Sequence, residues 1–156
     1  LESLRGEAIV SLENVSVKEA NDILTSVKGD AFDIEITFAK TQVEQFGIHV
    51  RMTEDQVEDT FIYYDQVKNG LYINRLHSST DTTKKDVVGG AYVYEGSLNL
   101  RILLDRSLIE VYANKTHSLT ARVYPSLDDA KGLKIEHGND DAIINKLIIY
   151  PMKSIN

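Results

Sequence analysis

The sequence feature that most restricts the fold of this chain is the stretch at residues 98–113, LNLRILLDRSLIEVYA. Every second residue over 98–104 is aliphatic, which is the pattern of a β-strand with one buried face. The same alternation runs over 109–113, after a break at Arg106 and Ser107. We therefore predict a β-hairpin that reverses direction at these two residues.

The position of this turn decides which side chains face each other across the hairpin. The inner-face pairs are Leu104 with Ile109, Ile102 with Val111, and Leu100 with Ala113. The outer-face pairs are Leu103 with Glu110, and Arg101 with Tyr112. Arg101 then lies diagonal to Glu110, so we predict an ion pair between them, while Asp105 closes the turn.

Strand-like runs continue along most of the chain. Residues 32–38 and 46–52 alternate in the same way, and Asn69-Gly70 is the dipeptide favoured in two-residue type I′ hairpin turns. Further strands are expected at 61–64, 71–73, 91–94, 119–124, 133–135 and 143–150. Short strands separated by glycine and polar turns predict an all-β fold, a two-sheet antiparallel β-sandwich of the concanavalin-like jelly-roll type.

Four segments depart from the strand pattern. Residues 17–25, VKEANDILT, are expected to form a helical turn, although several of them are poor helix formers. Residues 77–90 are polar and are expected to form a mobile loop. The acidic stretches at 53–59 and 139–141 lack the spacing and the glycine of a calcium-binding loop, so we expect solvated turns there.

Composition excludes several classes of function. A length of 156 residues suits one domain, and the net charge of −7 disfavours binding to nucleic acid or to an anionic membrane. No apolar run is long enough to span a membrane. The chain has no cysteine, and its four histidines are dispersed, so neither a metal site nor a cofactor is predicted. The histidines are His49, His77, His117 and His137.

The hairpin resembles the LR(I/V)xxDRSxxEV(F/Y) segment in the C-terminal β-sandwich domain of glycoside hydrolase family 32. This is the family of invertases, levanases, inulinases and sucrose-6-phosphate hydrolases. The other matching motifs follow in the family's order: LESLRG at 1–6 resembles ELExLRG, GDAFDI at 29–34 resembles GDxxEI, and FGIHVR at 46–51 resembles FGFxVR. Tyr124-Pro125 and Tyr150-Pro151 fall where that domain usually has an aromatic or apolar residue before proline. Residues 74–79, NRLHSS, depart from the usual DRSxSG.

The resemblance implies that residues 1–6 are a linker from a catalytic five-bladed propeller and that residues 7–156 form a single C-terminal β-sandwich domain. The propeller motifs WMNDPNG, RDP and EC do not occur in this sequence. A retaining glycosidase needs two carboxylates about 5 Å apart, and the family's pair is not among these residues. We therefore expect a non-catalytic module of a β-fructosidase, with no catalytic residue of its own, that stabilises the propeller and packs on it. Some relatives use this domain in dimer contacts, so a homodimer stays open, as do the compartment and the substrate of the parent enzyme.

Asp105, Arg106, Glu110 and Arg101 are the residues that we expect to hold the turn and to contact the propeller. By residue type, Asp105 and Glu110 also suit a catalytic carboxylate pair, and Arg106 also suits a contact with a sugar or a carboxylate. The hairpin register favours structural roles for all of them, because it puts Asp105 at the turn and Glu110 on the outer face of a strand.

Tyrosines support the alternative function, a fructan- or carbohydrate-binding module. The chain has eight tyrosines and no tryptophan. Tyr92 and Tyr94 alternate on one predicted strand, while Tyr63 and Tyr72 fall on neighbouring strands. Aromatic faces bind the C–H surface of sugars, although the same rings also suit packing between sheets or against the propeller. A lectin-like sandwich unrelated to fructan enzymes is the third alternative.

Overall fold

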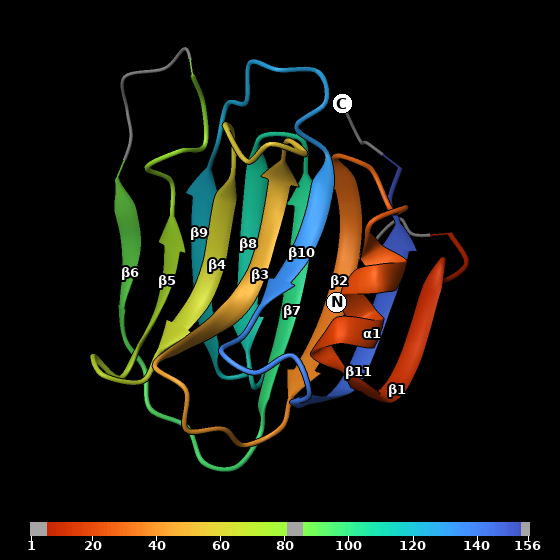
Figure 1. Ribbon diagram of the computed structural model, residues 1–156. Helices are drawn as coiled ribbons and strands as arrows, with labels where there is room; N and C mark the ends of the chain where they lie inside the picture. Colours follow the sequence, from red (N-terminus) through yellow and green to blue (C-terminus); the bar gives the residue numbers. More distant parts are fainter. Residues whose placement is uncertain (1–5, 81–85, 154–156) are drawn as a thin grey trace.

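The computed structural model describes residues 6–80 and 86–153, which form two antiparallel sheets packed face to face (Figure 1). One sheet has six strands in the order β1-β11-β2-β7-β8-β9, and the other has five in the order β10-β3-β4-β5-β6. The elements are β1 Val10–Ser16, α1 Val17–Leu24, β2 Ala31–Phe38, β3 Gln45–Met52, β4 Thr60–Asp65, β5 Gly70–Asn74, β6 Val87–Ala91, β7 Leu98–Asp105, β8 Leu108–Ala113, β9 His117–Arg122, β10 Gly132–Glu136 and β11 Ile143–Pro151. The predicted all-β, two-sheet antiparallel sandwich is confirmed.

The β7–β8 hairpin has the predicted register. Its inner-face pairs are Leu104 with Ile109, Ile102 with Val111, and Leu100 with Ala113. Strand β2 continues the sheet beyond β7, and β9 continues it beyond β8, so the hairpin lies inside the six-stranded sheet rather than at its edge. A one-residue slip would turn the aliphatic side chains of both strands toward solvent, which is why the alternation specifies the pairing.

The hydrophobic core lies between the two sheets. Ile34 of β2 and Ile102 of β7 come from the six-stranded sheet, Ile62 of β4 comes from the five-stranded sheet, and each is fully buried. The rings of Phe38 in β2 and Phe46 in β3 meet edge to face with centroids 4.9 Å apart, joining the sheets directly. Burial of these large apolar side chains is the main stabilising contribution, at about 1.5–3 kcal/mol for each.

Helix α1 covers one side of the sandwich, where it packs against β10, β1 and β11 (Figure 1). Its N-terminus carries a capping box, in which Ser16 accepts from the Glu19 N–H and the Glu19 side chain reaches back to the Ser16 N–H. The Asn21 side chain accepts from the Ile135 N–H at 2.7 Å and donates to the Ile135 carbonyl at 2.9 Å. The helical turn predicted at 17–25 is confirmed, and it is attached to the edge of the five-stranded sheet.

The type I′ turn predicted at Asn69-Gly70 is wrong. Strands β4 and β5 are joined by four residues, 66–69, because Gly70 already pairs with Asp65 as the first residue of β5. Asn69 has a positive φ of 52°, and Gly70 does not share this conformation. The Asp65 carboxylate accepts from the N–H groups of Val67 and Lys68 at 2.9 Å, so a side chain organises the longer turn.

The strand predicted at 91–94 lies four residues earlier, because β6 covers Val87–Ala91. Gly89 adopts φ +132°, and a Cβ at this position would collide with the Leu71 carbonyl in β5. A strand with two glycines lacks the alternation that revealed the other strands. The loop predicted at 77–90 falls partly on residues 81–85, which lie outside the described residues, and its last residues form β6.

Candidate functional site

Neighbouring segments hold the Arg106-Ser107 turn through its backbone. Arg106 adopts φ 57°, and its N–H donates to the Asp30 carbonyl at 2.7 Å. The Ser107 carbonyl accepts from the Val123 N–H at 2.8 Å. The Arg51 guanidinium donates to the Arg106 carbonyl at 2.6 Å. The turn is therefore an anchored part of the fold, whereas the Arg106 side chain is exposed.

Arg51, which the sequence analysis did not single out, links the two sheets. It belongs to β3 in the five-stranded sheet, is 8% exposed, and reaches the Arg106 carbonyl in the hairpin of the six-stranded sheet. Its Nε also donates to the Ala130 carbonyl at 2.7 Å. Burial lowers the pKa of this guanidinium from its ordinary value. The only signal in the sequence was its place in the FGIHVR motif at 46–51.

Arg75 makes a second link of the same kind from the loop that departs from the family pattern. It is 9% exposed and forms an ion pair with Asp86, to which its Nε donates at 2.8 Å. Its Nη1 donates to the Arg122 carbonyl at 2.7 Å, which connects the end of β5 with β9 in the other sheet. Within residues 74–79, whose role the sequence left open, Arg75 therefore joins the two sheets at this position.

Arg101 forms its ion pair with Asp33 on the neighbouring strand β2. The guanidinium donates to the two carboxylate oxygens at 2.8 and 3.2 Å, and Asp33 is 1% exposed. Glu110, the partner expected from the hairpin register, accepts a hydrogen bond from the Tyr112 hydroxyl at 2.7 Å. This hydrogen bond raises the pKa of Tyr112 above its ordinary value. Arg101 and Glu110 are thus each bound to a different group from the one predicted.

These groups belong to a row of polar side chains on the outer face of the six-stranded sheet. We call this set the polar row: Asp33, Glu35, Asn99, Arg101, Glu110, Tyr112 and Lys146. Glu35 joins two of its members, because it accepts from Asn99 at 2.9 Å and pairs with Lys146 at 3.4 Å. The row therefore crosses four adjacent strands, β11, β2, β7 and β8.

Asp105 lies at the end of β7, next to the turn, as its place in the register predicted. One of its carboxylate oxygens, Oδ1, is buried and has no hydrogen-bond partner within residues 6–80 and 86–153. Of the four expected site residues, the structure places Asp105 and Arg106 at the turn, and Arg101 and Glu110 in the polar row.

Glu58 is a buried carboxylate that the sequence analysis missed. Residues 53–59 were expected to be a solvated turn, and this is wrong for Glu58, which is fully buried. Its oxygens accept from the N–H groups of Thr80 at 2.6 Å, Ser126 at 3.1 Å and Leu127 at 2.9 Å. Burial alone would raise the pKa of Glu58, but these hydrogen bonds outweigh burial and lower the pKa to about 2. No local pattern marks Glu58, because its partners come from two distant loops.

His49 lies on the outer face of the five-stranded sheet between two carboxylates. Its Nδ1 is 2.7 Å from an Asp59 oxygen, and its Nε2 is 2.8 Å from Glu136. The ring also stacks on Phe61, with centroids 4.3 Å apart. Burial opposes the charged imidazole, but the hydrogen bonds and charges of Asp59 and Glu136 outweigh it and raise the pKa of His49.

Tyr63 and Tyr72 lie on this same outer face, opposite each other in β4 and β5. The Tyr63 ring stacks on Phe61 at 4.8 Å and tilts against Tyr72 at 5.7 Å, and it is only 7% exposed. The Lys68 ammonium lies over the Tyr72 ring at 5.6 Å. The Tyr63 ring is thus largely covered by protein neighbours, whereas Tyr72 is partly exposed.

Tyr92 and Tyr94 follow β6 rather than lying in a strand. Tyr92 stacks on His117 with centroids 4.5 Å apart, and Tyr94 meets Tyr64 edge to face at 4.9 Å. The Tyr64 hydroxyl donates to the Tyr92 carbonyl at 2.8 Å, which ties this segment to β4. Among the tyrosines named by the sequence analysis, Tyr94 lines a pocket, together with Tyr64.

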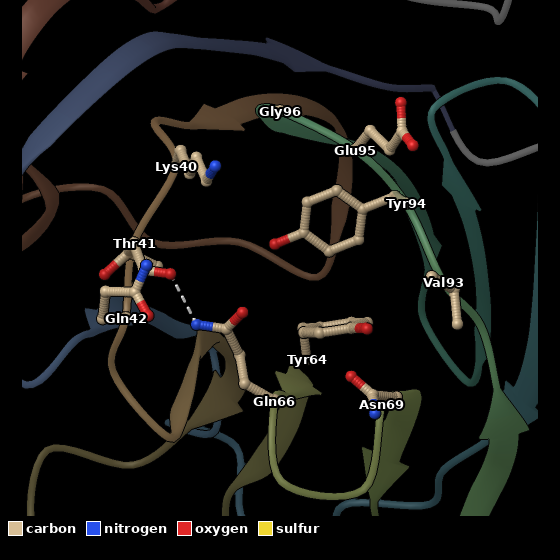
Figure 2. A pocket seen from close by; sticks show the side chains of 10 residues that line it. All are labelled: Lys40, Thr41, Gln42, Tyr64, Gln66, Asn69, Val93, Tyr94, Glu95 and Gly96. Carbon is tan, nitrogen blue, oxygen red and sulfur yellow. Dashed lines mark hydrogen bonds between the residues drawn. The ribbon is translucent and has the colours of Figure 1, made fainter.

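Figure 2 shows this pocket, which has a volume of about 460 Å³. Lys40 and Gln42 lie on one side, Tyr94 lies on the other, and Gln66 lies below (Figure 2). The three segments that meet there are the β2–β3 loop, the β4–β5 turn and the segment after β6. These segments lie at the opposite end of the sandwich from the Arg106 turn (Figure 1).

Within residues 6–80 and 86–153, no group of three or more His, Cys, Asp or Glu side chains is arranged to hold a metal ion. Residues 139–141 are exposed, as a solvated turn requires. Among the described residues, no helix is both long and apolar enough to cross a membrane.

Comparison with known sequences gives one consistent family. Residues 1–151 match the family described as "Glycosyl hydrolases family 32 C terminal". The levanase of Bacillus subtilis (strain 168) is 29% identical over 164 aligned positions, which cover 99% of this chain and 24% of the levanase. The extracellular exo-inulinase of Aspergillus awamori is 32% identical over 111 positions, covering 67% of this chain and 21% of the inulinase. The chain spans about a quarter of these relatives or less.

Solved structures share the fold. Fructan 1-exohydrolase IIa from Cichorium intybus superposes with a TM-score of 0.79 at 16% identity, covering 97% of this chain and 36% of that one. The exo-inulinase from Aspergillus awamori gives a TM-score of 0.71 at 22% identity, covering 99% of this chain and 28% of that one. In both cases a large part of the other chain has no counterpart here.

Proposed function

Since the chain belongs to the family of C-terminal domains of family 32 glycosyl hydrolases, we propose that it is the non-catalytic module of a β-fructosidase and that it stabilises an N-terminal catalytic propeller by packing on it. This proposal rests on the share of each protein that the matches cover: nearly all of this chain, but only a small part of its relatives. The family match takes up residues 1–151, and 99% of the chain aligns with only 24% of the levanase. We assign bond cleavage in sucrose or a fructan to the part of the enzyme that precedes this domain.

We assign the contact with the propeller to the outer face of the six-stranded sheet. The Gly6 N–H donates to the Pro151 carbonyl at 3.0 Å, and the Ile9 N–H donates to the Ile149 carbonyl at 2.8 Å. The chain thus enters the domain alongside β11, so a preceding domain is attached next to this sheet. Its outer face combines the polar row with a half-buried leucine, Leu103, a mixture typical of interfaces between domains.

The turn at the end of β7 extends this contact surface. The Arg106 backbone is held by Asp30 and Arg51, while its side chain is exposed and free to reach a second domain. A guanidinium on a rigid support loses little conformational freedom on binding, which suits an interface residue. Asp105, Arg106, Glu110 and Arg101 therefore keep the structural and interface roles proposed for them.

The test compares a parent polypeptide, in which a catalytic propeller precedes Leu1, with the same polypeptide lacking residues 1–156. We expect the intact enzyme to release fructose from sucrose or a fructan, and deletion of this module to lower the melting temperature of the propeller. Addition of the separate chain should restore part of that loss. Release of fructose by the 156-residue chain alone, or an unchanged melting temperature after deletion, would contradict the proposal.

A further inference from the structure

We propose that the pocket lined by Tyr94 and Gln66 binds the end of a neutral saccharide. This pocket lies between the β2–β3 loop, the β4–β5 turn and the segment after β6 (Figure 2). The inference goes beyond the proposed function and does not depend on it, because the propeller contact is assigned to the outer face of the six-stranded sheet, whereas the pocket lies among loops at one end of the sandwich. Four properties of the pocket support it.

Gln66 supplies a hydrogen-bond acceptor whose orientation is set before any ligand arrives. Its amide nitrogen donates to the carbonyls of Thr41 at 2.7 Å and Val43 at 2.8 Å. Both amide hydrogens are thereby used, so the side-chain oxygen turns away from the loop and toward the middle of the pocket (Figure 2). A preorganised acceptor of this kind suits a ligand hydroxyl group.

Tyr94 supplies an apolar wall that is also rigid. Its ring meets Tyr64 edge to face with centroids 4.9 Å apart, and Tyr64 is 3% exposed. The Tyr64 hydroxyl binds the Tyr92 carbonyl at 2.8 Å, so the segment that carries Tyr94 is anchored to β4. Tyr94 is also partly exposed and lines the pocket, so its ring can contact the C–H face of a sugar ring.

The Tyr94 hydroxyl supplies a second polar group. Figure 2 shows it directed across the pocket toward the side of Lys40 and Thr41. A tyrosine hydroxyl is protonated at neutral pH, since its ordinary pKa is about 10 and burial raises the pKa of Tyr94 further, so this group both donates and accepts hydrogen bonds. A sugar hydroxyl has the same dual capacity.

The lining of the pocket carries no net charge. Lys40 and Glu95 are both exposed and opposite in sign, and the other eight lining residues are uncharged. Such a lining does not favour an ionic ligand of either sign, whereas the hydroxyl groups of a neutral ligand can bind both charged side chains. The volume of about 460 Å³ is within the range of small-molecule pockets, roughly 300–1,000 Å³. It suits the end of an oligosaccharide rather than the length of a polymer.

The test is a titration of the isotope-labelled 156-residue chain with sucrose and with a short inulin-type oligosaccharide, followed by amide NMR shifts. We expect a dissociation constant of about 1–10 mM, with shifts concentrated at residues 40–42, 66–69 and 93–96. Glycerol, a small polyol without a sugar ring, serves as the ligand control. Absence of shifts at these residues, or equal shifts with glycerol, would overturn the proposal.

Two variants locate the binding. Tyr94→Leu keeps apolar packing on Tyr64 but removes the ring and hydroxyl, and we expect it to weaken saccharide binding by about tenfold or more. Gln42→Ala changes an exposed residue of the same pocket without touching the core, and it should weaken binding by a smaller factor. Tyr124→Ala, at an exposed tyrosine outside the pocket, should leave saccharide binding unchanged.

Unchanged binding in both pocket variants would refute the site. Saccharide-induced NMR shifts around Tyr63, in place of shifts at the pocket, would refute it as well. None of these outcomes depends on a propeller, so the two proposals fail separately.

Discussion

At the scale of single residues, we expect Glu58 to contribute strongly to stability, although no pattern in the neighbouring sequence marks it. Its carboxylate accepts hydrogen bonds from the N–H groups of Thr80, Ser126 and Leu127 and from the hydroxyls of Thr80 and Ser126. The carboxylate holds two loops that meet at the end of the sandwich. A buried charge with this many donors is stabilising only in its ionised form.

We therefore predict that Glu58→Gln lowers the free energy of unfolding at pH 7 by about 3 kcal/mol, because the pKa falls from 4.5 to about 2 on folding. A folded-state pKa below the unfolded value means that this stability is complete above pH 4.5 and is lost as the pH falls toward 2. Urea unfolding of both proteins across this range tests the sign. Glu54→Gln, at an exposed glutamate of the same loop, is the matched control. A destabilisation that is constant between pH 7 and pH 2 would contradict the prediction.

His49 gives a second prediction, with the opposite dependence on pH. Burial opposes its charge, yet Asp59 and Glu136 raise its pKa above 6.5. The stability from this group is therefore complete below pH 6.5 and is lost as the pH rises through the folded-state pKa. Glu136→Gln should lower the pKa of His49 and should destabilise the protein more below pH 6.5 than at alkaline pH.

An NMR titration of the His49 ring measures this shift directly. Glu13→Gln, at an exposed glutamate in β1, should leave the midpoint of His49 where it is. His137 provides an internal reference, because burial lowers its pKa and its ring should titrate below 6.5 in all three proteins. A His49 midpoint that does not respond to Glu136→Gln would show that this carboxylate is not responsible for the shift.

At the scale of elements, two buried arginines connect strands that the sheet hydrogen bonds leave separate. Arg51 extends from β3 to the turn between β7 and β8, and Arg75 extends from the end of β5 to β9. Each donates to a backbone carbonyl of the opposite sheet. Side-chain donors at these positions satisfy carbonyls that the sheet ladder does not use.

Removal of one of these links should therefore loosen the hairpin turn without disrupting the core. Arg51→Met keeps most of the aliphatic stem but loses the bonds to the Arg106 and Ala130 carbonyls. We expect it to lower the free energy of unfolding by about 2–4 kcal/mol, since the buried Ala130 carbonyl and the partly buried Arg106 carbonyl lose their donor. Hydrogen exchange at the Arg106 amide should rise as well. Arg122→Met, at an exposed arginine that donates to Ser107 at 3.3 Å, should change both quantities much less.

The elements also show which features of the structure are specified by residues close together in the sequence. The β7–β8 hairpin could be predicted in full, because the alternation of aliphatic residues on both sides of one turn specifies the register. Strand β6 could not, since two of its five residues are glycines and its pairing is decided by β5. The burial of Glu58 depends on donors 22 to 69 residues away, which no pattern in a short window reveals. The same limit applies to the Arg101–Asp33 pair, whose residues are 68 positions apart.

At the scale of the whole molecule, we expect the contribution of the polar row to stability to depend on contact with a second domain. Glu110 is half-buried and binds the Tyr112 hydroxyl within its own strand. In the parent enzyme, we predict that Glu110→Ala lowers the melting temperature while the rate of bond cleavage per folded molecule stays the same. Thermal unfolding together with active-site-normalised hydrolysis separates the two effects. A normal melting temperature with a lost cleavage step would assign Glu110 to catalysis instead.

The outer face of the six-stranded sheet offers a sharper test. One substitution on it is expected to leave the stability of the isolated domain nearly unchanged. Leu103 lies opposite Asp33 on one side and Glu110 on the other. A lysine at this position would have two carboxylates as neighbours, so Leu103→Lys should change the stability of the separate chain by no more than about 0.5 kcal/mol. Beneath a packed propeller, the same ammonium group would be desolvated and would displace an apolar contact. We therefore expect the variant to destabilise the parent enzyme by at least about 2 kcal/mol more than it destabilises the chain.

The control for this prediction is Val87→Lys, at an exposed valine on the edge of the other sheet. It should affect the stability of the chain and of the parent enzyme equally. Equal effects of Leu103→Lys in the two settings would remove this face from the interface, and an excess effect of Val87→Lys in the parent would place the interface on the five-stranded sheet.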